Sequence, residues 1–298
     1  MERILTQKIK TEDGGMTAGT FLKERLGFTK AQISSLKFRQ NGICLNGRKV
    51  RVTETLTAGD ILTLQLEESN ADQVSAHLES CEHPIEVLYE DRDIICVWKP
   101  TGMVVHPAGR HYRDSMSNYL KAYFEKRGQQ VCMRSIGRLD RDASGILVFA
   151  KNQIAAAKLW KQREDGIFTK EYLALCEGTF PPEVFEAEQM VDLPLMRAEK
   201  YKMTVSRTGK AACTYYQAVT EISASHTLVR LHLQTGRMHQ IRVHMSAIGH
   251  PLVGDPIYGN GIAGKDSAQL CAWKCEFIQP FTEEKICVQY HEMENIQQ

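Results

Sequence analysis

Residues 137–152 read GRLDRDASGILVFAKN, and this stretch joins a cluster of charges to an apolar run. Arg138, Asp140, Arg141 and Asp142 fall within five positions, and the segment ILVFA follows directly after Gly145. A short apolar run of this kind is typical of a strand that is buried on both faces of a sheet. We therefore expect a central buried strand over 146–150, with two carboxylates and two guanidiniums held at its start.

The segments on either side of this strand predict a large sheet with a few helices. Alternating apolar residues and turn signals indicate strands in IEVLYEDRDIICVWKP, EYLALCEG, ACTYYQAVTEI and HTLVRLHLQTG. Helical spacing of apolar residues indicates helices over 114–128, 153–164 and 238–250. The predicted fold class is α+β, with a large mixed or antiparallel sheet.

The first 70 residues have a different pattern and predict a small separate unit. A helix is expected over 17–27, and Thr29 is a suitable cap for a second helix whose apolar side is Ile33, Leu36 and Phe38. The pair Asn46-Gly47 is a strong hairpin signal between two short strands. We assign residues 1–70 to this unit, 71–83 to a polar linker and 84–298 to the main domain.

The charge of the chain is balanced overall but uneven along the sequence. The net charge is +1, yet residues 23–51 contain eight basic residues and a single acid, Glu24, for a local net charge of +7. A solvated helix face normally mixes the two signs, whereas a segregated basic patch is the electrostatic mark of a nucleic-acid surface. Lys37, Arg39 and Arg48 are the candidate phosphate-binding residues in this patch.

Several other classes of protein are disfavoured by the sequence. No run of 18 apolar residues is present, so no membrane span is expected. The nine scattered cysteines include no CxxC pair, which favours reduced core cysteines and a cytoplasmic location. His239 and His244 are five positions apart, not the four that place two histidines on one helix face for a metal. We expect neither a metal nor a cofactor.

The segment 238–250 places a cation on a helix that should be partly buried. Arg242 follows Ile241, which is on the apolar face of that helix. A buried guanidinium needs an acidic partner, and Asp140 is the natural candidate. A carboxylate beside a fixed guanidinium is stabilised in its charged form. Asp140 is therefore expected to act as a nucleophile or an electrostatic stabiliser.

Four ordered motifs resemble those of the RluA-type pseudouridine synthases, and most closely the RluD-like members. They are YEDRDIICVWKPTGMVVHP, GRLDRDASGILVFAK, KEYLAL and GRMHQIRVHMSAIGHPLVGDPIYG. The resemblance covers nearly the whole chain, and the first unit resembles the small RNA-binding domain with the alpha-L motif. It implies a catalytic domain preceded by an alpha-L domain, and an enzyme that isomerises chosen uridines in structured RNA without a cofactor.

The resemblance also implies roles for individual residues. Asp140 would be the catalytic aspartate, whether it attacks the sugar or the ring or lets a glycal form. Tyr172 would stack on the uracil, and Arg242 would pair with the aspartate. Arg138 would fill the gap left by the flipped nucleotide, and Arg237 and His239 are further candidate RNA-binding residues.

Two positions depart from the catalytic motif, which usually reads HRLDRDTSG in the family. Gly137 stands where histidine is usual and Ala143 where threonine is usual, which puts the choice of target in doubt more than the chemistry. We expect a monomer that acts on large-subunit ribosomal RNA, with transfer RNA as the second choice. The alternative from another class is an inactive RNA-binding or ribosome-assembly protein.

Overall fold

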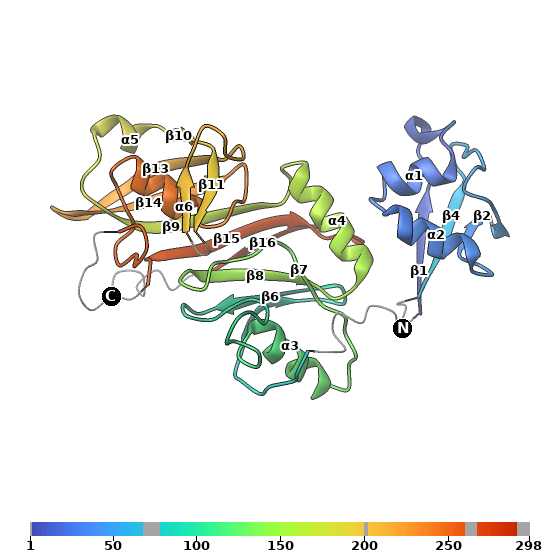
Figure 1. Ribbon diagram of the computed structural model, residues 1–298. Coiled ribbons are helices and arrows are strands. Elements are labelled where there is room, and N and C mark those ends of the chain that lie inside the picture. The colour runs from blue at the N-terminus through green and yellow to red at the C-terminus, as the bar shows by residue number, and fades with distance from the viewer. Residues whose placement is uncertain (1, 68–77, 200–201, 260–266, 291–298) are drawn as a thin grey trace.

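The computed structural model describes residues 2–67, 78–199, 202–259 and 267–290 (Figure 1). Over these residues the strands form a four-stranded sheet, a ten-stranded sheet and a two-stranded ribbon. The α+β class with a large mixed sheet is confirmed. Residues 71–77 of the predicted linker lie outside the described residues.

The four-stranded sheet belongs to the N-terminal unit. Its strand order is β1-β4-β2-β3, and all its neighbouring strands are antiparallel. The elements of this unit are β1 (Glu2–Lys8), the 3-10 turn η1 (Thr11–Asp13), α1 (Ala18–Glu24), α2 (Lys30–Phe38), β2 (Ile43–Leu45), β3 (Arg48–Lys49) and β4 (Ile61–Glu67). The two helices and the sheet enclose one apolar core that includes Phe21, Leu22, Leu36 and Leu64.

Local signals in the N-terminal unit have the expected structural effect. Thr29 caps α2 and forms a reciprocal capping box with Gln32, which satisfies backbone donors at the helix start. Asn46 and Gly47 both have positive φ, at 51° and 80°, as the tight turn between β2 and β3 requires.

Phe38 is a correction to the predicted core of this unit. Leu36 is buried, but the Phe38 side chain is 78% exposed. Residues two positions apart do not share a helix face, so Phe38 points away from the side that Leu36 buries. The predicted apolar side of α2 was therefore wrong at its last residue.

The ten-stranded sheet forms the body of the main domain. Its order is β10-β13-β14-β9-β15-β8-β6-β5, with β16 beside β15 and β7 beside β8. The first strands along the chain are β5 (Glu86–Glu90), β6 (Ile94–Lys99), β7 (Arg134–Ser135), β8 (Ser144–Ala150) and β9 (Thr169–Glu177). The later ones are β10 (Gln189–Asp192), β13 (Cys213–Ser223), β14 (His226–Leu233), β15 (Leu270–Ile278) and β16 (Lys285–Gln289). The pair β15–β8 is parallel and the others are antiparallel, so the sheet is mixed.

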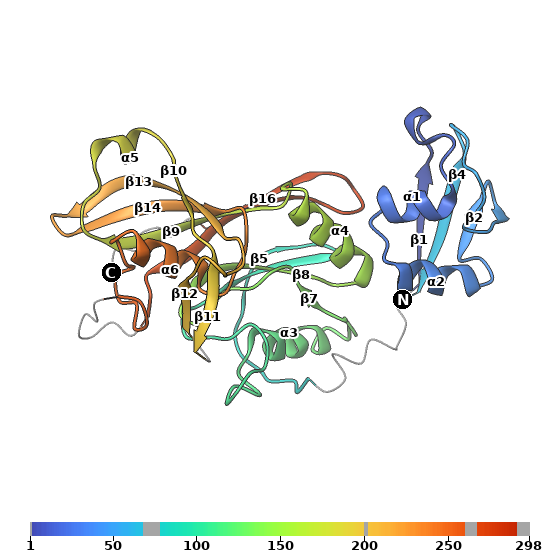
Figure 2. The same ribbon diagram turned by 45° about the horizontal axis from the view of Figure 1, so that its top comes forward.

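Helices and a ribbon surround this sheet (Figure 2). The helices are α3 (Met116–Glu125), α4 (Gln153–Glu164), the short α5 (Pro182–Glu186) and α6 (Gln240–Ala247), and the ribbon is β11 (Leu195–Glu199) with β12 (Lys202–Val205). On the side of the sheet toward the N-terminal unit, α4 is the nearest helix (Figures 1 and 2). Gln32 of α2 donates a hydrogen bond to the Gln153 carbonyl at 3.2 Å, and Ile154 packs on the N-terminal core. No helix among the described residues is long and apolar enough to cross a membrane.

The strand β8 is buried on both faces, as its sequence predicts. Leu147 and Phe149 join the core cluster on one face, whereas Ile146, Val148 and Ala150 join the cluster on the other. At its start, Gly145 has φ 126°, and a Cβ there would lie 2.4 Å from the Ala272 backbone nitrogen of β15. Only glycine allows β8 to lie this close to β15. The charged loop before Gly145 is thereby fixed at the middle of the sheet.

Candidate active site

The register of the sheet brings three distant motifs together. Gly145 of β8 pairs with Ala272 of β15, Ala272 pairs with Tyr172 of β9, and Tyr172 pairs with Leu231 of β14. These residues form one row across four strands. The loop that ends at Gly145 therefore lies next to the part of β9 that contains Tyr172. Sequence reasoning identified both segments, and the pairing of the strands explains why they meet.

Asp140 lies in that loop and is half-buried. Burial lowers the pKa of Lys99 and His239 and raises that of Tyr172 and Tyr258. The negative charge of Asp140 acts on each of these four groups and on Arg242, and it favours their protonated forms. The carboxylate therefore lies within electrostatic range of groups from β6, β9, α6 and the segment after it. No described residue donates a hydrogen bond to the Asp140 carboxylate. The backbone carbonyl of Asp140 accepts the N–H group of Ala143 at 3.2 Å.

Arg242 is buried on α6 and has two acidic partners, and neither of them is Asp140. Its Nε and Nη2 donate to the two carboxylate oxygens of Asp255, both at 2.7 Å, and its Nη1 donates to Asp142 Oδ2 at 3.2 Å. The predicted ion pair with Asp140 was therefore wrong. Helical spacing showed that Arg242 is buried, but it did not show which of the nearby aspartates its side chain reaches. Arg242 fixes the loop of Asp140 through Asp142, two residues further along.

The ion pair between Arg242 and Asp255 is tight and almost wholly buried. Burial disfavours both charges, but the two hydrogen bonds outweigh it, so the pKa of Arg242 is raised and that of Asp255 is lowered. Asp255 Oδ1 also accepts the backbone N–H groups of Ile257 and Tyr258, at 2.9 and 3.1 Å. The charges are therefore well satisfied, as a buried pair requires.

Lys99 is a second buried cation at this site, and sequence reasoning missed it. Its Nζ donates to the carbonyls of Pro100, Met103 and Arg141, at 2.8, 2.9 and 3.2 Å. Burial lowers its pKa from 10.5 to about 8, although Asp140 and Asp142 oppose the shift. Lys99 therefore ties the loop after β6 to the loop of Asp140. The signal available in the sequence was the position of Lys99 at the end of the apolar strand segment IICVWK.

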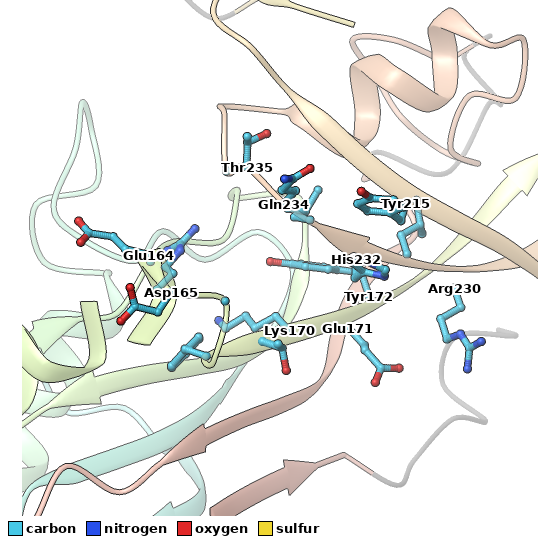
Figure 3. Close-up of a pocket in the computed structure, with 18 of the residues that line it drawn as sticks. Glu164, Asp165, Lys170, Glu171, Tyr172, Tyr215, Arg230, His232, Gln234 and Thr235 are labelled. Carbon is cyan, nitrogen blue, oxygen red and sulfur yellow. The ribbon is translucent and has the colours of Figure 1, made fainter. Parts of the chain in front are cut away.

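Tyr172 projects from β9 into a cavity of about 880 Å³ (Figure 3). Its side chain is 8% exposed. Burial and the charge of Asp140 raise the pKa of Tyr172 against the opposing charge of Arg163, so it remains a neutral phenol at ordinary pH. Tyr215 and His232 stack on each other in the wall, with ring centroids 4.6 Å apart.

The predicted RNA-binding residues of the main domain lie near this site. Arg138 is exposed and lines the cavity. His239 is the residue before α6, its Nδ1 lies 2.9 Å from the Tyr258 hydroxyl, and its pKa is lowered by burial. Arg237 is exposed and its Nε donates to the Ala211 carbonyl at 3.0 Å.

The predicted phosphate-binding residues of the N-terminal unit lie on other elements. Lys37 and Arg39 come from the end of α2, and Arg48 from β3. Lys37 and Arg48 are exposed, and Arg48 pairs with Glu54 at 2.8 Å on the surface. None of the three lines the cavity that contains Tyr172.

The described parts of the chain contain no group of three or more His, Cys, Asp or Glu side chains placed to hold a metal. His244, one of the histidines weighed as a ligand, is buried and binds the Thr214 hydroxyl and the Leu193 carbonyl, both at 2.9 Å. All nine cysteines are free.

Comparison with known proteins finds similarity to RNA pseudouridine synthases. The family of RNA pseudouridylate synthases matches residues 93–247. An uncharacterized RNA pseudouridine synthase of Bacillus subtilis, YjbO, is 33% identical over 263 residues, which is 88% of this chain and 90% of that protein. Ribosomal large subunit pseudouridine synthase D of Vibrio cholerae is 34% identical over 253 residues, covering 83% and 74% of the two chains. Human RNA pseudouridylate synthase domain containing 1 has a similar structure, with a TM-score of 0.56 and 25% identity over 70% of this chain and 84% of the human one.

Proposed function

The chain belongs to the RNA pseudouridylate synthase family, and from that premise we propose that it converts specific uridines of large-subunit ribosomal RNA to pseudouridine. The enzyme is an isomerase that modifies RNA. The observation that most supports the site is the row of paired residues from Gly145 to Tyr172, because it places the Asp140 loop beside the phenol. The likeness to enzymes named for the large ribosomal subunit supports the choice of target.

In the proposed reaction, Asp140 acts on the nucleoside and the bond between ribose C1′ and uracil N1 breaks. The uracil turns and rejoins C1′ through C5, the proton on C5 is lost, and N1 gains one. The carboxylate attacks the sugar, attacks the ring, or removes a ribose proton to give a glycal. Each route requires an ionised carboxylate whose oxygens are accessible, and those of Asp140 accept no hydrogen bond from the described residues.

The other residues of the site have separate roles in this proposal. Tyr172 stacks on the uracil, and its hydroxyl, kept neutral by a raised pKa, takes part in the transfer of the C5 proton. Arg242 is a positioning residue, because its contacts are to Asp142 and Asp255. Arg138 occupies the gap that the target nucleotide leaves when it is flipped out of the RNA stack, which is needed to expose its glycosidic bond.

The N-terminal unit provides affinity in this proposal. We assign residues 1–70 to an alpha-L type RNA-binding domain and 84–298 to the catalytic domain. Lys37, Arg39 and Arg48 contact phosphates, which position the protein but carry no sequence information. Arg237 and His239 contact the RNA beside the cavity. The enzyme acts as a monomer, and a ribosomal RNA substrate places it in the cytoplasm.

The test is to map pseudouridine in RNA from cells that lack the gene. Carbodiimide treatment and primer extension are expected to show the loss of specific pseudouridines from large-subunit ribosomal RNA. The wild-type gene restores them and the Asp140→Asn gene does not. Loss confined to transfer RNA would overturn the proposed target, and restoration by the Asp140→Asn gene would overturn the proposed mechanism.

A further inference from the structure

Arg163, near the end of α4, fills a space that two glycines leave open. A Cβ at Gly137 would lie 2.2 Å from Arg163 Nη1, and a Cβ at Gly236 would lie 2.6 Å from Arg163 Nη2. Carbon and nitrogen atoms that are not bonded cannot approach so closely, so any side chain at either position would displace the guanidinium. Gly137 also has φ 82°, which favours glycine. The guanidinium of Arg163 therefore lies against the backbones of two sequence motifs at once.

This location places Arg163 in the wall of the cavity. Gly137 and Gly236 directly precede Arg138 and Arg237, and Arg138 and Arg163 line the same cavity as Tyr172. The positive charge of Arg163 acts on the Tyr172 hydroxyl. On its other side the guanidinium lies over the Trp160 ring, 5.2 Å from its centroid. The side chain is thus held in place by packing on Trp160 and by the two glycines.

Arg163 has no acidic partner among the described residues, although acids are nearby. Of the four acids of the cavity wall, three are already paired: Asp165 with Lys161 at 2.6 Å, Glu171 with Lys274 at 3.0 Å and Glu188 with His232 at 3.0 Å. The fourth, Glu164, is exposed and forms no ion pair with Arg163. No described residue accepts a hydrogen bond from the Arg163 guanidinium. A fixed cation whose donors are unused, in the wall of an open cavity, is suited to an anion that comes from outside the protein.

We propose that Arg163 binds a backbone phosphate of the RNA next to the flipped nucleotide. Its guanidinium lies directly beside Gly137, the residue before Arg138. A guanidinium can make two parallel hydrogen bonds to a phosphodiester, and Arg is well suited to this contact. The inference rests on the proposed function in one respect, since it requires that RNA enters this cavity, but it does not depend on which RNA is the substrate.

The experiment measures single-turnover isomerisation of an RNA fragment at several salt concentrations. Arg163→Ala is expected to weaken RNA binding by about 10- to 100-fold, the usual cost of losing a hydrogen bond to a charged group. The slope of log affinity against log salt is expected to fall by about 0.7–0.9. The maximal rate at saturating RNA should change only a few-fold. Arg163→Lys keeps the charge but not the paired hydrogen bonds, so it should retain the salt slope and bind with intermediate affinity.

Arg127→Ala is the matched control. Arg127 follows α3, is exposed, and lies over the Tyr123 ring at 3.6 Å, much as Arg163 lies over Trp160, but it is outside the cavity. The control removes the same charge and the same kind of ring contact, and it should leave affinity unchanged. If Arg163→Ala keeps the affinity and salt slope of wild type, as Arg127→Ala should, then Arg163 does not bind phosphate.

A second pair of variants separates phosphate binding from a structural role. Gly137→Ala should displace the guanidinium and weaken binding in the wild-type background, but it should add little in the Arg163→Ala background. Equal effects in both backgrounds would mean that Gly137 acts through backbone strain and would overturn the proposed link between the two residues. Wild-type turnover on ribosomal and transfer RNA fragments, measured in parallel, tests the proposed target separately.

Discussion

Charged side chains of α6 and the segment after it, which hold the loop of Asp140, differ from those of the N-terminal unit in burial and in pairing. Arg242 and Asp255 have side-chain exposures of 1% and 0% and are joined by two hydrogen bonds of 2.7 Å. Arg48 of the N-terminal unit is 73% exposed, and it pairs with Glu54 on the surface. Buried, fully bonded charges hold a loop in one geometry, whereas an exposed charge can exchange a surface partner such as Glu54 for a phosphate. The difference suggests that one region performs the chemistry and the other provides affinity.

The largest effect is expected for Asp140→Asn. The amide keeps the shape of the carboxylate and removes its charge, so pseudouridine formation should fall by at least about 10⁴-fold, as for the loss of other catalytic nucleophiles. No described residue donates a hydrogen bond to this carboxylate, so the melting temperature should change much less than the activity. Tritium release from RNA labelled at uridine C5 measures the activity. A variant that still isomerised RNA at a near-normal rate would contradict the mechanism.

Arg242→Met should affect both folding and activity. Removing the guanidinium leaves Asp255 buried without its cation, whereas Asp142 keeps Arg141 at 3.2 Å. The loss of one partner of a buried pair costs about 3–5 kcal/mol of unfolding free energy. Activity should also be lost, because the loop of Asp140 is no longer fixed through Asp142. Denaturant unfolding and single-turnover kinetics check the two effects. An Arg242→Met protein as stable as wild type would show that this ion-pair network does not hold the loop.

Tyr172→Phe should lower turnover by roughly 10²–10⁴-fold, the usual contribution of a positioned acid or base. RNA affinity should hardly change, since the ring can still stack on a base. Rate and affinity are separated by single-turnover measurements over a range of RNA concentrations. Equal maximal rates for the variant and wild type would remove the hydroxyl from the chemistry.

Lys99 predicts a pH dependence. Its pKa in the folded protein is lowered to about 8. Above that pH the neutral amine has only two donors for three carbonyls and no charge near Asp140, so the maximal rate should decline as pH rises through about 8. The contribution of Lys99 to the free energy of unfolding should instead increase as pH rises. Between pH 8 and 10.5 the unfolded chain binds a proton that the folded one lacks, so this group makes unfolding less favourable as pH rises.

The corresponding measurements are a pH profile of the single-turnover rate and melting temperatures over the same range. Lys99→Met should be slower at every pH and should lack the decline near pH 8. The same decline in Lys99→Met would assign it to another group.

The smallest effect on chemistry is expected for the N-terminal unit. The full-length variant Lys37→Ala/Arg39→Ala/Arg48→Ala should bind RNA more weakly, with a salt slope lower by about 0.7–0.9 for each phosphate that is no longer neutralised. The maximal rate at saturating RNA should stay close to that of wild type, because none of the three side chains lines the cavity. Binding titrations at several salt concentrations check the slope. An unchanged affinity and slope would show that this face is not the RNA anchor.

Local features of the fold could be predicted from the sequence because they depend on neighbouring residues. The buried strand β8, the cap at Thr29, the Asn46-Gly47 turn and the burial of Arg242 all follow from short patterns. Phe38 was placed wrongly because the residue at a helix end was assumed to continue the apolar side.

The partner of Arg242 could not be predicted, because it depends on how α6 lies against two different loops. Asp140, Asp142 and Asp255 were all acids within or near the motifs, and spacing alone does not distinguish them. Asp255 begins a turn in which it accepts the N–H groups of Ile257 and Tyr258, and the turn residues in GDPIYG were the available signal. Arg163 was missed because its role depends on the space beside two glycines, which a sequence does not show.

The division between chemistry and affinity is tested most directly by one measurement, the single-turnover rate of isomerisation as a function of RNA concentration. It gives the maximal rate and the apparent dissociation constant together, and it is made for wild type, Asp140→Asn and Lys37→Ala/Arg39→Ala/Arg48→Ala. We predict that Asp140→Asn loses the maximal rate, while its dissociation constant, measured by direct binding, is unchanged. The triple variant should keep the maximal rate and have a larger dissociation constant. A triple variant with wild-type affinity but a greatly reduced maximal rate would contradict this division.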